Sequence, residues 1–457
     1  MQSSAKAILG VDDCEIESVQ TQVKKDTSYM EMTIRYSGDI PDVCPKCGAK
    51  MYRHGARPIE VADTPMGGQA CRWKVELPRK RCKECGYLWK AELSGVDEDR
   101  KITKRAMIDI TDKALRNTFA TVADEYLLTI NTIKNVFVDF LNDNQANLRF
   151  VTPCFIGIDE IKIKKLGEVT VITDLEHRTL FDMLQGRNQK TLTEYFMNMP
   201  DREKVLWVCS DMYRPFEKSI ADAMPNARWA IDHFHVVMKA NEAVDAIRRV
   251  IQADMKKTDR IKTKRGLAYT LKTRTKHLTL EEASKIRAIR SDKALAPLAT
   301  AFDLKEDFFN IYDENPSSKE NAQKAFKEWE ESIPEDKLFE KFRDLAKTVH
   351  NFYEQIFNYW DCPIQISNGF TECTNRIIRE NSTRGRGYSF DILRGRTLYR
   401  KTNIRNLLTH GMLAIGPDIP ETDPVFHFEG IDVEDYDDEE TLKPGVDFDP
   451  DTGEIYE

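Results

Sequence analysis

The stretch CFIGIDEIKIKK, residues 154–165, has the alternating pattern of a β-strand and carries two acidic residues at its centre. With a period of two, Asp159 falls on the face that holds Phe155 and Ile161, whereas Glu160 falls among lysines. A carboxylate on the apolar side of a strand costs on the order of several kcal/mol unless something binds it. Asp159 is therefore the first candidate site residue, and Glu160 is expected to be its solvated neighbour.

Length, charge and apolar runs limit the class of protein. The chain has 457 residues, which predicts about three domains. Its net charge is −8, but residues 417–457 hold 16 acidic residues and one lysine, which leaves a charge of +7 on the other 416 residues. The body is mildly basic, and we expect the acidic tail to be flexible. Because no apolar run approaches the roughly 20 residues of a membrane span and no signal-peptide core is present, we expect a cytoplasmic protein without a membrane partner.

Two Cys-x-x-Cys-Gly motifs, at residues 44–48 and 82–86, precede the opening stretch in the chain. Each predicts a tight knuckle with a glycine where the backbone turns, and four thiolates suit one tetrahedral Zn²⁺. The intervening 34 residues fit a zinc ribbon, in which strands such as Arg72–Pro78 fill the gap. His54 and Cys71, which lie between the motifs, are expected to be structural residues and not zinc ligands. The alternative to a zinc site is two pairs of free thiols. The expected zinc ligands are Cys44, Cys47, Cys82 and Cys85.

Residues 101–145 have helical periodicity. We expect an amphipathic helix over Thr103–Ala114, then two helices around a break near Leu127, the second capped by Thr129. This pattern indicates a helix-turn-helix, although Leu127 and its neighbour stand where the turn usually has a glycine. A plain helical linker is the alternative. The residues that such a recognition helix would present to base edges are Asn131, Thr132, Lys134 and Asn135.

Strands and helices alternate after the opening stretch. The buried strand that begins at Val205 ends in Asp211, and acids at the carboxyl ends of strands in open α/β sheets lie where ligands bind. Charged helical sequence follows residue 250 for about a hundred residues, which indicates an inserted helical subdomain. A late helix with Ser367 as N-cap places Glu372 on a polar stripe opposite an apolar packing face. The other members of this stripe are Asn368, Asn375 and Arg379.

Three acids therefore stand out, namely Asp159, Asp211 and Glu372. The order of the strands and the placement of the acids match the RNase H-like fold, in which these positions converge. Three carboxylates at close range repel one another, so they are suited to bind divalent cations, and oxygen ligands favour Mg²⁺ or Mn²⁺ over zinc. Each acid alone could be a solvated residue, and Glu160 or Asp174 could replace any one of them, so the set of three carries the argument.

Five blocks of the sequence resemble bacterial insertion-sequence transposases of the ISL-three family, which belong to the DDE group. The blocks are IGIDEIKIKK, WVCSDMYRPF, AIDHFHVVMKAN, YWDCPIQISNGFTECTNRIIRE and RGRGYSFDILRGRTLYR. The resemblance covers nearly the whole chain except the acidic tail. It implies that Asp159, Asp211 and Glu372 hold two Mg²⁺ (or Mn²⁺) ions for phosphoryl transfer without a covalent protein intermediate.

The resemblance also implies roles for residues near the acids. Arg379 stands where the family commonly has a lysine two helical turns after the glutamate, and it can hold a phosphate at two points. Asp232 and His235 fall where related transposases place a Cys-or-Asp, x, x, His motif. On sequence alone His235 is either a structural hydrogen-bonding residue or a participant in the chemistry.

The implied activity is cleavage at the 3′ ends of an insertion sequence and joining of those ends to target DNA. The implied partners are double-stranded DNA, both the terminal inverted repeats and the target, and further copies of the chain in a homodimer or larger oligomer associated with the bacterial nucleoid. Four arginines after the Glu372 helix are expected to follow DNA phosphates, and a solvated helix face is their alternative. They are Arg384, Arg386, Arg394 and Arg396.

Two other functions are weaker explanations of the same residues. A DNA-binding regulator with a vestigial nuclease core is disfavoured because such a core would be expected to lose at least one acid. An RNase H-like junction resolvase is disfavoured because the chain has two separate DNA-binding modules and a large insertion.

The expected architecture is multidomain α+β, with an RNase H-like α/β catalytic domain interrupted by an all-helical insertion. In chain order we expect N-terminal strands with a zinc ribbon (1–98), including an edge strand at Tyr29–Ser37, a helix-turn-helix domain (99–150), the first part of the catalytic core (151–250), the helical insertion (251–360), the second part of the core (361–416) and the acidic tail (417–457).

Overall fold

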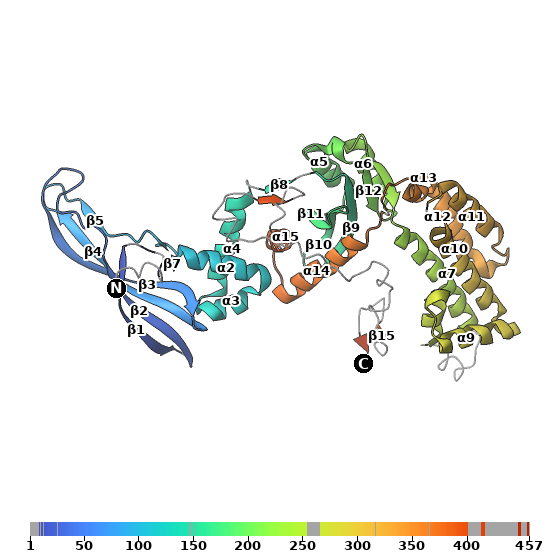
Figure 1. Ribbon diagram of the computed structural model, residues 1–457, viewed down its shortest axis with the longest axis horizontal. Coiled ribbons are helices and arrows are strands. Elements are labelled where there is room, and N and C mark those ends of the chain that lie inside the picture. Colours follow the sequence, from blue (N-terminus) through green and yellow to red (C-terminus); the bar gives the residue numbers. More distant parts are fainter. Residues whose placement is uncertain are drawn as a thin grey trace. The chain divides into compact units, whose positions relative to one another are not determined.

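A computed structural model describes residues 13–24, 26–145, 148–150, 152–253, 266–315, 317–364 and 366–400, with Leu9, Val11 and three short C-terminal strands (Figure 1). The chain forms two compact units. The first comprises residues 1–149, 162–167 and 376–413, and the second comprises residues 150–161, 168–375 and 414–457. The short segments β8 (Leu148–Phe150), β14 (Leu413–Ile415), β15 (Asp447–Phe448) and β16 (Ile455–Tyr456) complete the strands. Apart from β15 and β16, the acidic tail lies outside the described residues.

In the described part of the first unit, a seven-stranded sheet has the order β1-β2-β4-β3-β7-β6, with β5 paired to β4. We expected an edge strand at Tyr29–Ser37, but β2 lies between β1 and β4 and is therefore interior. The signal was hidden because β1 has few apolar residues to mark it as a strand. The strands are β1 (Cys14–Lys24), β2 (Thr27–Tyr36), β3 (Met51–Met66), β4 (Gln69–Cys82), β5 (Leu88–Lys90), β6 (Val96–Asp97) and β7 (Ile102–Thr103).

The two Cys-x-x-Cys motifs form matching knuckles beside β3 and β4. In the first, the Gly48 N–H donates to the carbonyl of Cys44 at 2.8 Å, and in the second the Gly86 N–H donates to Cys82 at 3.1 Å. Both glycines have positive φ angles, near +71° and +72°, which side chains rarely adopt. The ligand atoms of the four cysteines lie within 4.8 Å of one another, a cluster that suits one structural zinc ion. His54 and Cys71 are outside this cluster, as expected.

Three helices follow the sheet in the first unit, namely α2 (Lys104–Arg116), α3 (Phe119–Tyr126) and α4 (Ile130–Gln145). The Thr129 hydroxyl accepts from the Thr132 N–H at 3.1 Å, as an N-cap does. Leu127 adopts the left-handed conformation where a glycine would be usual, with φ of 48°. Arg72 of β4 holds this turn by donating to the carbonyls of Tyr126 and Leu127, at 3.0 and 2.6 Å. Arg72 is therefore engaged inside the fold.

The described residues of the second unit contain a five-stranded sheet of order β11-β10-β9-β12-β13 (Figure 1). β10 and β11 are antiparallel, whereas β9, β12 and β13 run parallel to one another. Ile156 and Ile158 of β9 share a buried core with apolar residues of α5 and α6. The elements are β9 (Phe155–Ile163), β10 (Gly167–Asp174), β11 (Thr179–Gln185), α5 (Gln189–Met197), β12 (Trp207–Ser210), α6 (Arg214–Ala223), β13 (Arg228–Ile231) and α7 (His233–Ala253).

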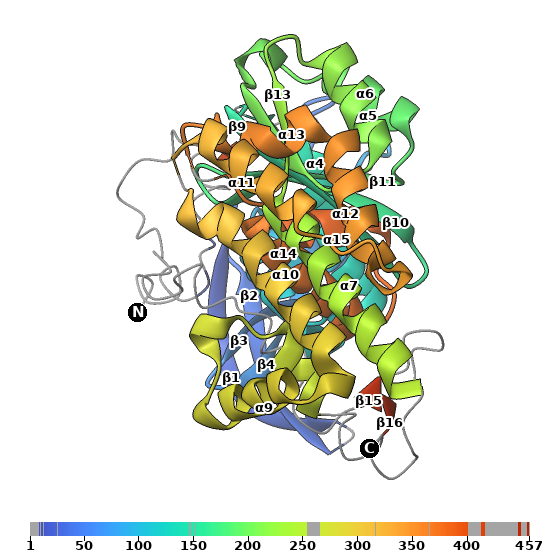
Figure 2. The same ribbon diagram turned by 90° about the vertical axis from the view of Figure 1, so that its right-hand side faces the viewer.

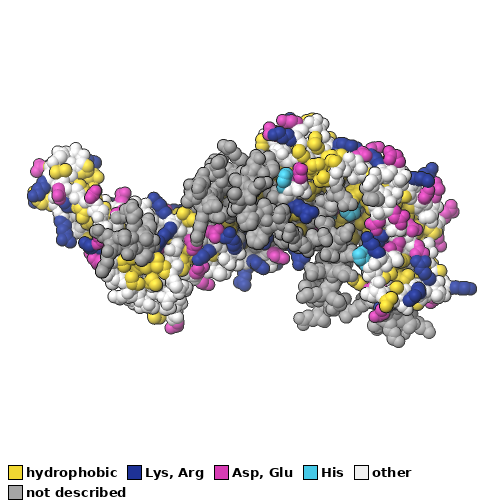
Figure 3. Space-filling model, viewed as in Figure 1, with side chains coloured by type: hydrophobic (Ala, Val, Ile, Leu, Met, Phe, Trp, Pro, Cys, Tyr) yellow, Lys and Arg dark blue, Asp and Glu magenta, His cyan; other side chains and the backbone are white. Residues whose placement is uncertain are grey.

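A helical insertion separates α7 from the last core helix, as expected (Figure 2). The long helix α10 packs against α7, α9 and α11, and α12 packs against α7. Figure 3 shows basic and acidic side chains interspersed on the visible face of the insertion. The helices are α9 (Leu280–Ser291), α10 (Ala296–Glu314), α11 (Lys319–Glu331), α12 (Glu340–Asn351) and α13 (Tyr353–Phe357), with 3₁₀ turns at Arg202–Lys204, Thr275–His277, Lys293–Leu295, Lys337–Phe339 and Asn358–Trp360.

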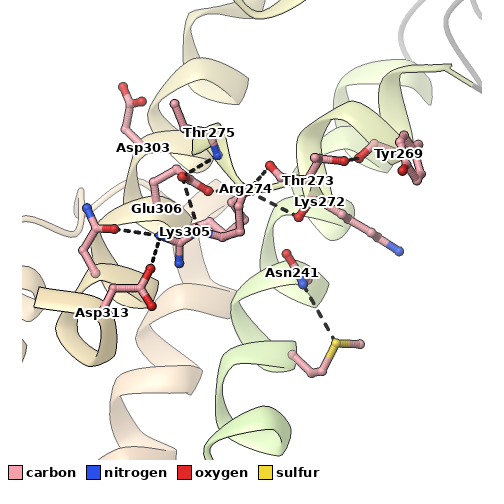
Figure 4. A network of polar contacts seen from close by, with 12 residues as sticks. Asn241, Tyr269, Lys272, Thr273, Arg274, Thr275, Asp303, Lys305, Glu306 and Asp313 are labelled. Carbon is pink, nitrogen blue, oxygen red and sulfur yellow. Dashed lines mark hydrogen bonds and ion pairs between the residues drawn. The ribbon is translucent and has the colours of Figure 1, made fainter. Parts of the chain in front are cut away.

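A buried polar network lies inside the insertion (Figure 4). The Lys305 side chain is 0% exposed, and its ammonium group contacts Glu306 at 2.7 Å and the carbonyl of Thr273 at 2.8 Å. Burial lowers the pKa of Lys305 to about 8, although Glu306 opposes this. Arg274 donates to Asp313 at 2.9 Å, so this arginine of the charged insertion sequence is internally paired. Residues 254–265 of the charged sequence lie outside the described residues.

The last two helices are α14 (Gly369–Gly385) and α15 (Phe390–Leu398). Residues 369–375 of α14 belong to the second unit, whereas the rest of α14 and all of α15 belong to the first. This differs from the expected assignment of residues 361–416 to the catalytic core. The difference arises because α15 packs against α2 of the first unit. No helix among the described residues is long and apolar enough to cross a membrane.

We expect Cys47→Ser to lower the zinc content from about one ion per chain to nearly none, because a hydroxyl replaces a thiolate ligand. Cys47 is exposed, so the exchange removes no buried packing. The measurement is bound zinc by atomic absorption, together with thermal unfolding. Cys71→Ser is the matched control, because Cys71 is a buried residue of the sheet outside the cluster and its variant should keep its zinc. Full zinc occupancy in the Cys47 variant would contradict the assignment.

Candidate active site

Three aspartates lie in a row at one end of the parallel strands of the second unit. In the strand register, Ile158 of β9 pairs with Ser210 of β12, and Ser210 pairs with Ile231 of β13. The next residue along each strand is acidic, so the three carboxylates lie side by side at the carboxyl ends of the strand pairings. They are Asp159, Asp211 and Asp232.

Asp232 was expected only as part of a motif beside the site, and sequence reasoning did not include it among the acids. The signal was available, because Asp232 directly follows a buried four-residue strand, as Asp211 does. Its N–H donates to the carbonyl of Ser210 at 2.9 Å, which extends the parallel pairing by one residue and fixes its position beside Asp211.

Helix α14 approaches the sheet at Gly157 of β9. The Asn368 side-chain amide donates to the carbonyl of Ile158 at 2.9 Å. The hydroxyls of Thr371 and Thr173 lie 2.6 Å apart, and Thr371 also donates to Asn368 at 2.7 Å. These contacts need a glycine at position 157, because a Cβ there would lie within 2.6 Å of all three side chains. The first two turns of α14 are therefore fixed against β9.

The buried side of α14 includes polar residues that were expected to lie opposite its packing face. We expected Asn368 and Asn375 to line a stripe opposite the packing face, but both are buried, with exposed fractions of 0% and 2%. Asn375 donates to the carboxylate of Asp159 at 2.6 Å. The hydrogen bonds to β9 explain the difference, since apolar side chains would leave the strand's carbonyl and carboxylate groups without partners.

Glu372 lies one turn before Asn375 and faces α7 rather than solvent alone. Its carboxylate is 3.6 Å from Nε2 of His235, a residue in the first turn of α7. Ligand atoms of Asp232, His235 and Glu372 all lie within 4.8 Å of one another. The structure thus brings His235 to the expected glutamate.

The acid cluster lacks a neutralising cation. Burial raises the pKa of Asp159, the Asp211 and Asp232 carboxylates raise it further, and the Glu160 N–H and His235 oppose the shift. Burial likewise raises the pKa of Asp211, against the effect of His235. No lysine or arginine among the described residues forms an ion pair with Asp159 or Asp211. Clustered carboxylate oxygens without such an ion-pair partner suit a divalent cation of the Mg²⁺ type.

Glu160 was expected to be solvated, and this is wrong. Its carboxylate accepts a hydrogen bond from Arg187 at 2.8 Å, and its side chain is only 14% exposed. Arg187 also lies over the ring of Tyr213 and pairs with Glu168 at 2.9 Å. Glu160 is therefore engaged in an ion pair of its own.

The residues expected to contact DNA are mostly exposed. Asn131, Lys134 and Asn135 lie on the outer surface of α4, and Thr132 is half-buried with its hydroxyl 2.8 Å from that of Thr129. Four arginines were expected at or after the end of α14, and three of them remain accessible to some degree. Arg384 and Arg386 are exposed and Arg394 is half-buried. Arg379 is exposed and lies seven residues after Glu372 on α14.

Arg396 does not fit the expected set of phosphate contacts, because it is buried. Arg396 is only 3% exposed. Its guanidinium donates to the carbonyls of Ala114 and Asn117, at the end of α2. Its guanidinium also lies 4.9 Å from the centre of the Tyr388 ring. These contacts fasten α15 to α2, so burial and not charge decides the role of Arg396.

Comparison with known proteins gives two family matches. Residues 156–397 match the ISL3 (ISL-three) model described as a transposase, and residues 40–85 match the model for the zinc-finger of the transposases of IS204, IS1001, IS1096 and IS1165. The chain is 24% identical over 362 residues to the transposase for insertion sequence element IS1001 of Bordetella parapertussis, which covers 76% of this chain and 85% of that protein. It is 25% identical over 307 residues to the transposase for IS1557 of Mycobacterium tuberculosis, covering 62% and 66%.

Gly157→Ala should displace α14 and destabilise the protein by about 1–3 kcal/mol, as overpacking does. The expected fall in Tm is about 2–4 °C per kcal/mol, measured by thermal unfolding. Gly369→Ala, at the start of the same helix, is the control, because its nearest contact to an added Cβ would be an ordinary 3.6 Å. Equal Tm values for the two variants would contradict the close approach at Gly157.

Asp211→Asn should raise the Tm of protein without added divalent cations. The folded pKa of Asp211 is raised, so its contribution to stability is present below the unfolded pKa and lost as pH rises through the folded pKa. At neutral pH the Asp211→Asn variant should therefore have the higher Tm, with about 2–4 °C for each kcal/mol of stability gained. This gain should vanish at pH values below the ordinary pKa range of aspartate.

The control for this prediction is Asp245→Asn on α7. Arg248 and neighbouring cations hold the pKa of Asp245 below its usual value despite its burial. Its amide variant should therefore lose stability at neutral pH. A Tm below that of the wild type for Asp211→Asn, as expected for the control, would contradict the prediction. It would show that the folded protein stabilises the charged Asp211 carboxylate without a bound cation.

Proposed function

The chain belongs to the ISL3 family of insertion-sequence transposases, and on this premise we propose that it binds the terminal inverted repeats of its own element and catalyses Mg²⁺-dependent DNA cleavage and strand transfer. The observation that supports this best is the row of acids on the parallel strands, with Glu372 of α14 beside it. The zinc ribbon and the mildly basic body are consistent with DNA as the partner.

We take the second unit to hold an RNase H-like catalytic core. The antiparallel pair β10 and β11 lies on one side of the central β9, and the parallel strands β12 and β13 lie on the other. The helical insertion interrupts this core between α7 and α14. The short catalytic segment of α14 is thus supplied by a distant part of the chain and fixed by its contacts with β9.

The proposed catalytic residues are Asp159, Asp211 and Glu372, which would hold two Mg²⁺ ions. Two bound Mg²⁺ ions would supply activation of the attacking water or 3′-OH and stabilisation of the leaving oxygen. Asp159 is oriented for this by Asn375 and by the Glu160 N–H, which donate at 2.6 and 2.7 Å to its two carboxylate oxygens. Tyr213 orients Asp211 through an N–H bond of 3.1 Å. The protein therefore fixes the acids before DNA arrives.

DNA recognition is assigned to the first unit. The helices α2–α4 have the lengths and the turn expected of a helix-turn-helix, and the exposed residues Asn131, Lys134 and Asn135 would face base edges. Arg384 in the last turn of α14 and Arg386 directly after the helix would bind phosphates, and Arg379 of α14 would hold a further phosphate. The active form is proposed to be a homodimer or larger oligomer, because two element ends must be joined together.

Replacing Asp159, Asp211 or Glu372 by alanine should abolish cleavage and strand transfer, by at least about 10³-fold, while sparing end binding. The assay combines purified full-length protein, labelled element ends and Mg²⁺, with strand mapping of the nicks and gel shifts for binding. Wild type should cleave at the 3′ ends.

Glu380→Ala is the matched control, because Glu380 is an exposed acid two turns after Glu372 on the same helix. It should retain activity. Strand transfer by any of the three variants would remove that acid from the site. End binding without cleavage by the wild type would favour the regulator instead.

A further inference from the structure

Asp232 and His235 form a group of possible metal ligands together with Glu372. Asp232 directly follows β13 and His235 lies three residues later in the first turn of α7, so both side chains project to the same side. One ligand atom from each of the three residues lies within 4.8 Å of the others. Three ligand atoms at this separation are close enough to surround one cation.

The Asp232 carboxylate is buried and has no hydrogen-bond partner among the described residues. The residue is 1% exposed, and neither of its carboxylate oxygens takes part in a hydrogen bond with any described residue. Nδ1 of His233 lies 3.5 Å from one of its oxygens, which is longer than a good hydrogen bond. An unpaired buried carboxylate costs several kcal/mol, on the order given for buried ions. Such a cost indicates a partner that the polypeptide itself does not supply.

His235 adds a second orphaned group to the same place. Its Nε2 is buried and has no hydrogen-bond partner among the described residues, and it lies 3.6 Å from the Glu372 carboxylate. One nitrogen and two carboxylates therefore lie close together, and the Asp232 carboxylate and His235 Nε2 have no hydrogen-bond partner among the described residues, as expected of ligands to a cation.

We propose that Asp232, His235 and Glu372 bind a divalent first-row transition-metal cation beside Asp159 and Asp211. Imidazole suits first-row metals, and carboxylates suit Mn²⁺ as well as Mg²⁺, so the mixed ligand set favours Mn²⁺ over Mg²⁺. The inference rests on the proposed function in one respect, because Glu372 is shared with the catalytic acids. Asp232 then becomes a fourth acid of the site, and His235 becomes a metal ligand.

The test uses full-length protein with its ribbon zinc in place, titrated with Mn²⁺. Electron paramagnetic resonance measures free Mn²⁺, and pulsed measurements detect a nitrogen ligand through its ¹⁴N coupling. Wild type should show ¹⁴N coupling from bound Mn²⁺. His235→Gln should lose that coupling and bind this Mn²⁺ at least about 10-fold more weakly, and Asp232→Asn should weaken binding similarly while keeping the ¹⁴N signal at saturating Mn²⁺.

His233→Gln is the matched control. His233 is the neighbouring imidazole, but its ring packs against the rings of Tyr312 and Tyr359, at 5.6 and 5.4 Å between centres. It should keep both the affinity and the ¹⁴N coupling. Loss of the coupling in this variant but not in His235→Gln would overturn the proposal, as would wild-type Mn²⁺ without nitrogen coupling. If His235→Gln unfolds, the isosteric Asp232→Asn still decides, since unchanged Mn²⁺ affinity there would refute the site.

The two proposals fail separately. Active Asp159→Ala protein would refute the proposed catalytic cluster, although Mn²⁺ could still show a nitrogen ligand from His235. Conversely, inactive Asp159→Ala protein combined with wild-type Mn²⁺ binding by both His235→Gln and Asp232→Asn would keep the catalytic cluster and remove only this cation site.

Discussion

The contact between α14 and β9 at Gly157 is the constraint on which the site depends. The helix reaches the strand closely enough for Asn368 to bond the Ile158 carbonyl because residue 157 has no side chain. Glu372 and Asn375 come from a segment more than 200 residues away in sequence, and this contact is what fixes them beside the strand ends. The opposite face of β9, with Ile156 and Ile158, is buried in the main core, so the strand cannot move away from the helix without disrupting that core.

The proposed function requires a costly arrangement of charges. Asp159, Asp211 and Asp232 are placed side by side by strand register, and the described residues give none of them a lysine or arginine ion-pair partner. The polypeptide orients Asp159 and Asp211 through amide and N–H groups, which donate to these carboxylates without neutralising them. Stability is supplied elsewhere, by the core that the sheet shares with α5, α6 and the helical insertion. Such a division is expected where a site trades stability for ligand binding.

Part of this arrangement was predictable from local sequence, and part was not. The cysteine spacing, the alternation of β9 and the buried strand before Asp211 are local signals, and the structure has the corresponding elements. The buried polar face of α14 was missed because helical periodicity shows which residues share a face but not what that face meets. Arg396 was misjudged for the same reason, since its partners on α2 are about 280 residues away in sequence. Asp232 could have been found, because it follows its strand as Asp211 does.

The most direct test of the central claim, that the strand-end acids and Glu372 form a divalent-cation site, is anomalous X-ray diffraction from crystals of the full-length protein grown with Mn²⁺. The account predicts anomalous density among the carboxylates of Asp159, Asp211 and Glu372. Ordered acids without anomalous density between them, at a Mn²⁺ concentration that supports DNA cleavage, would contradict it.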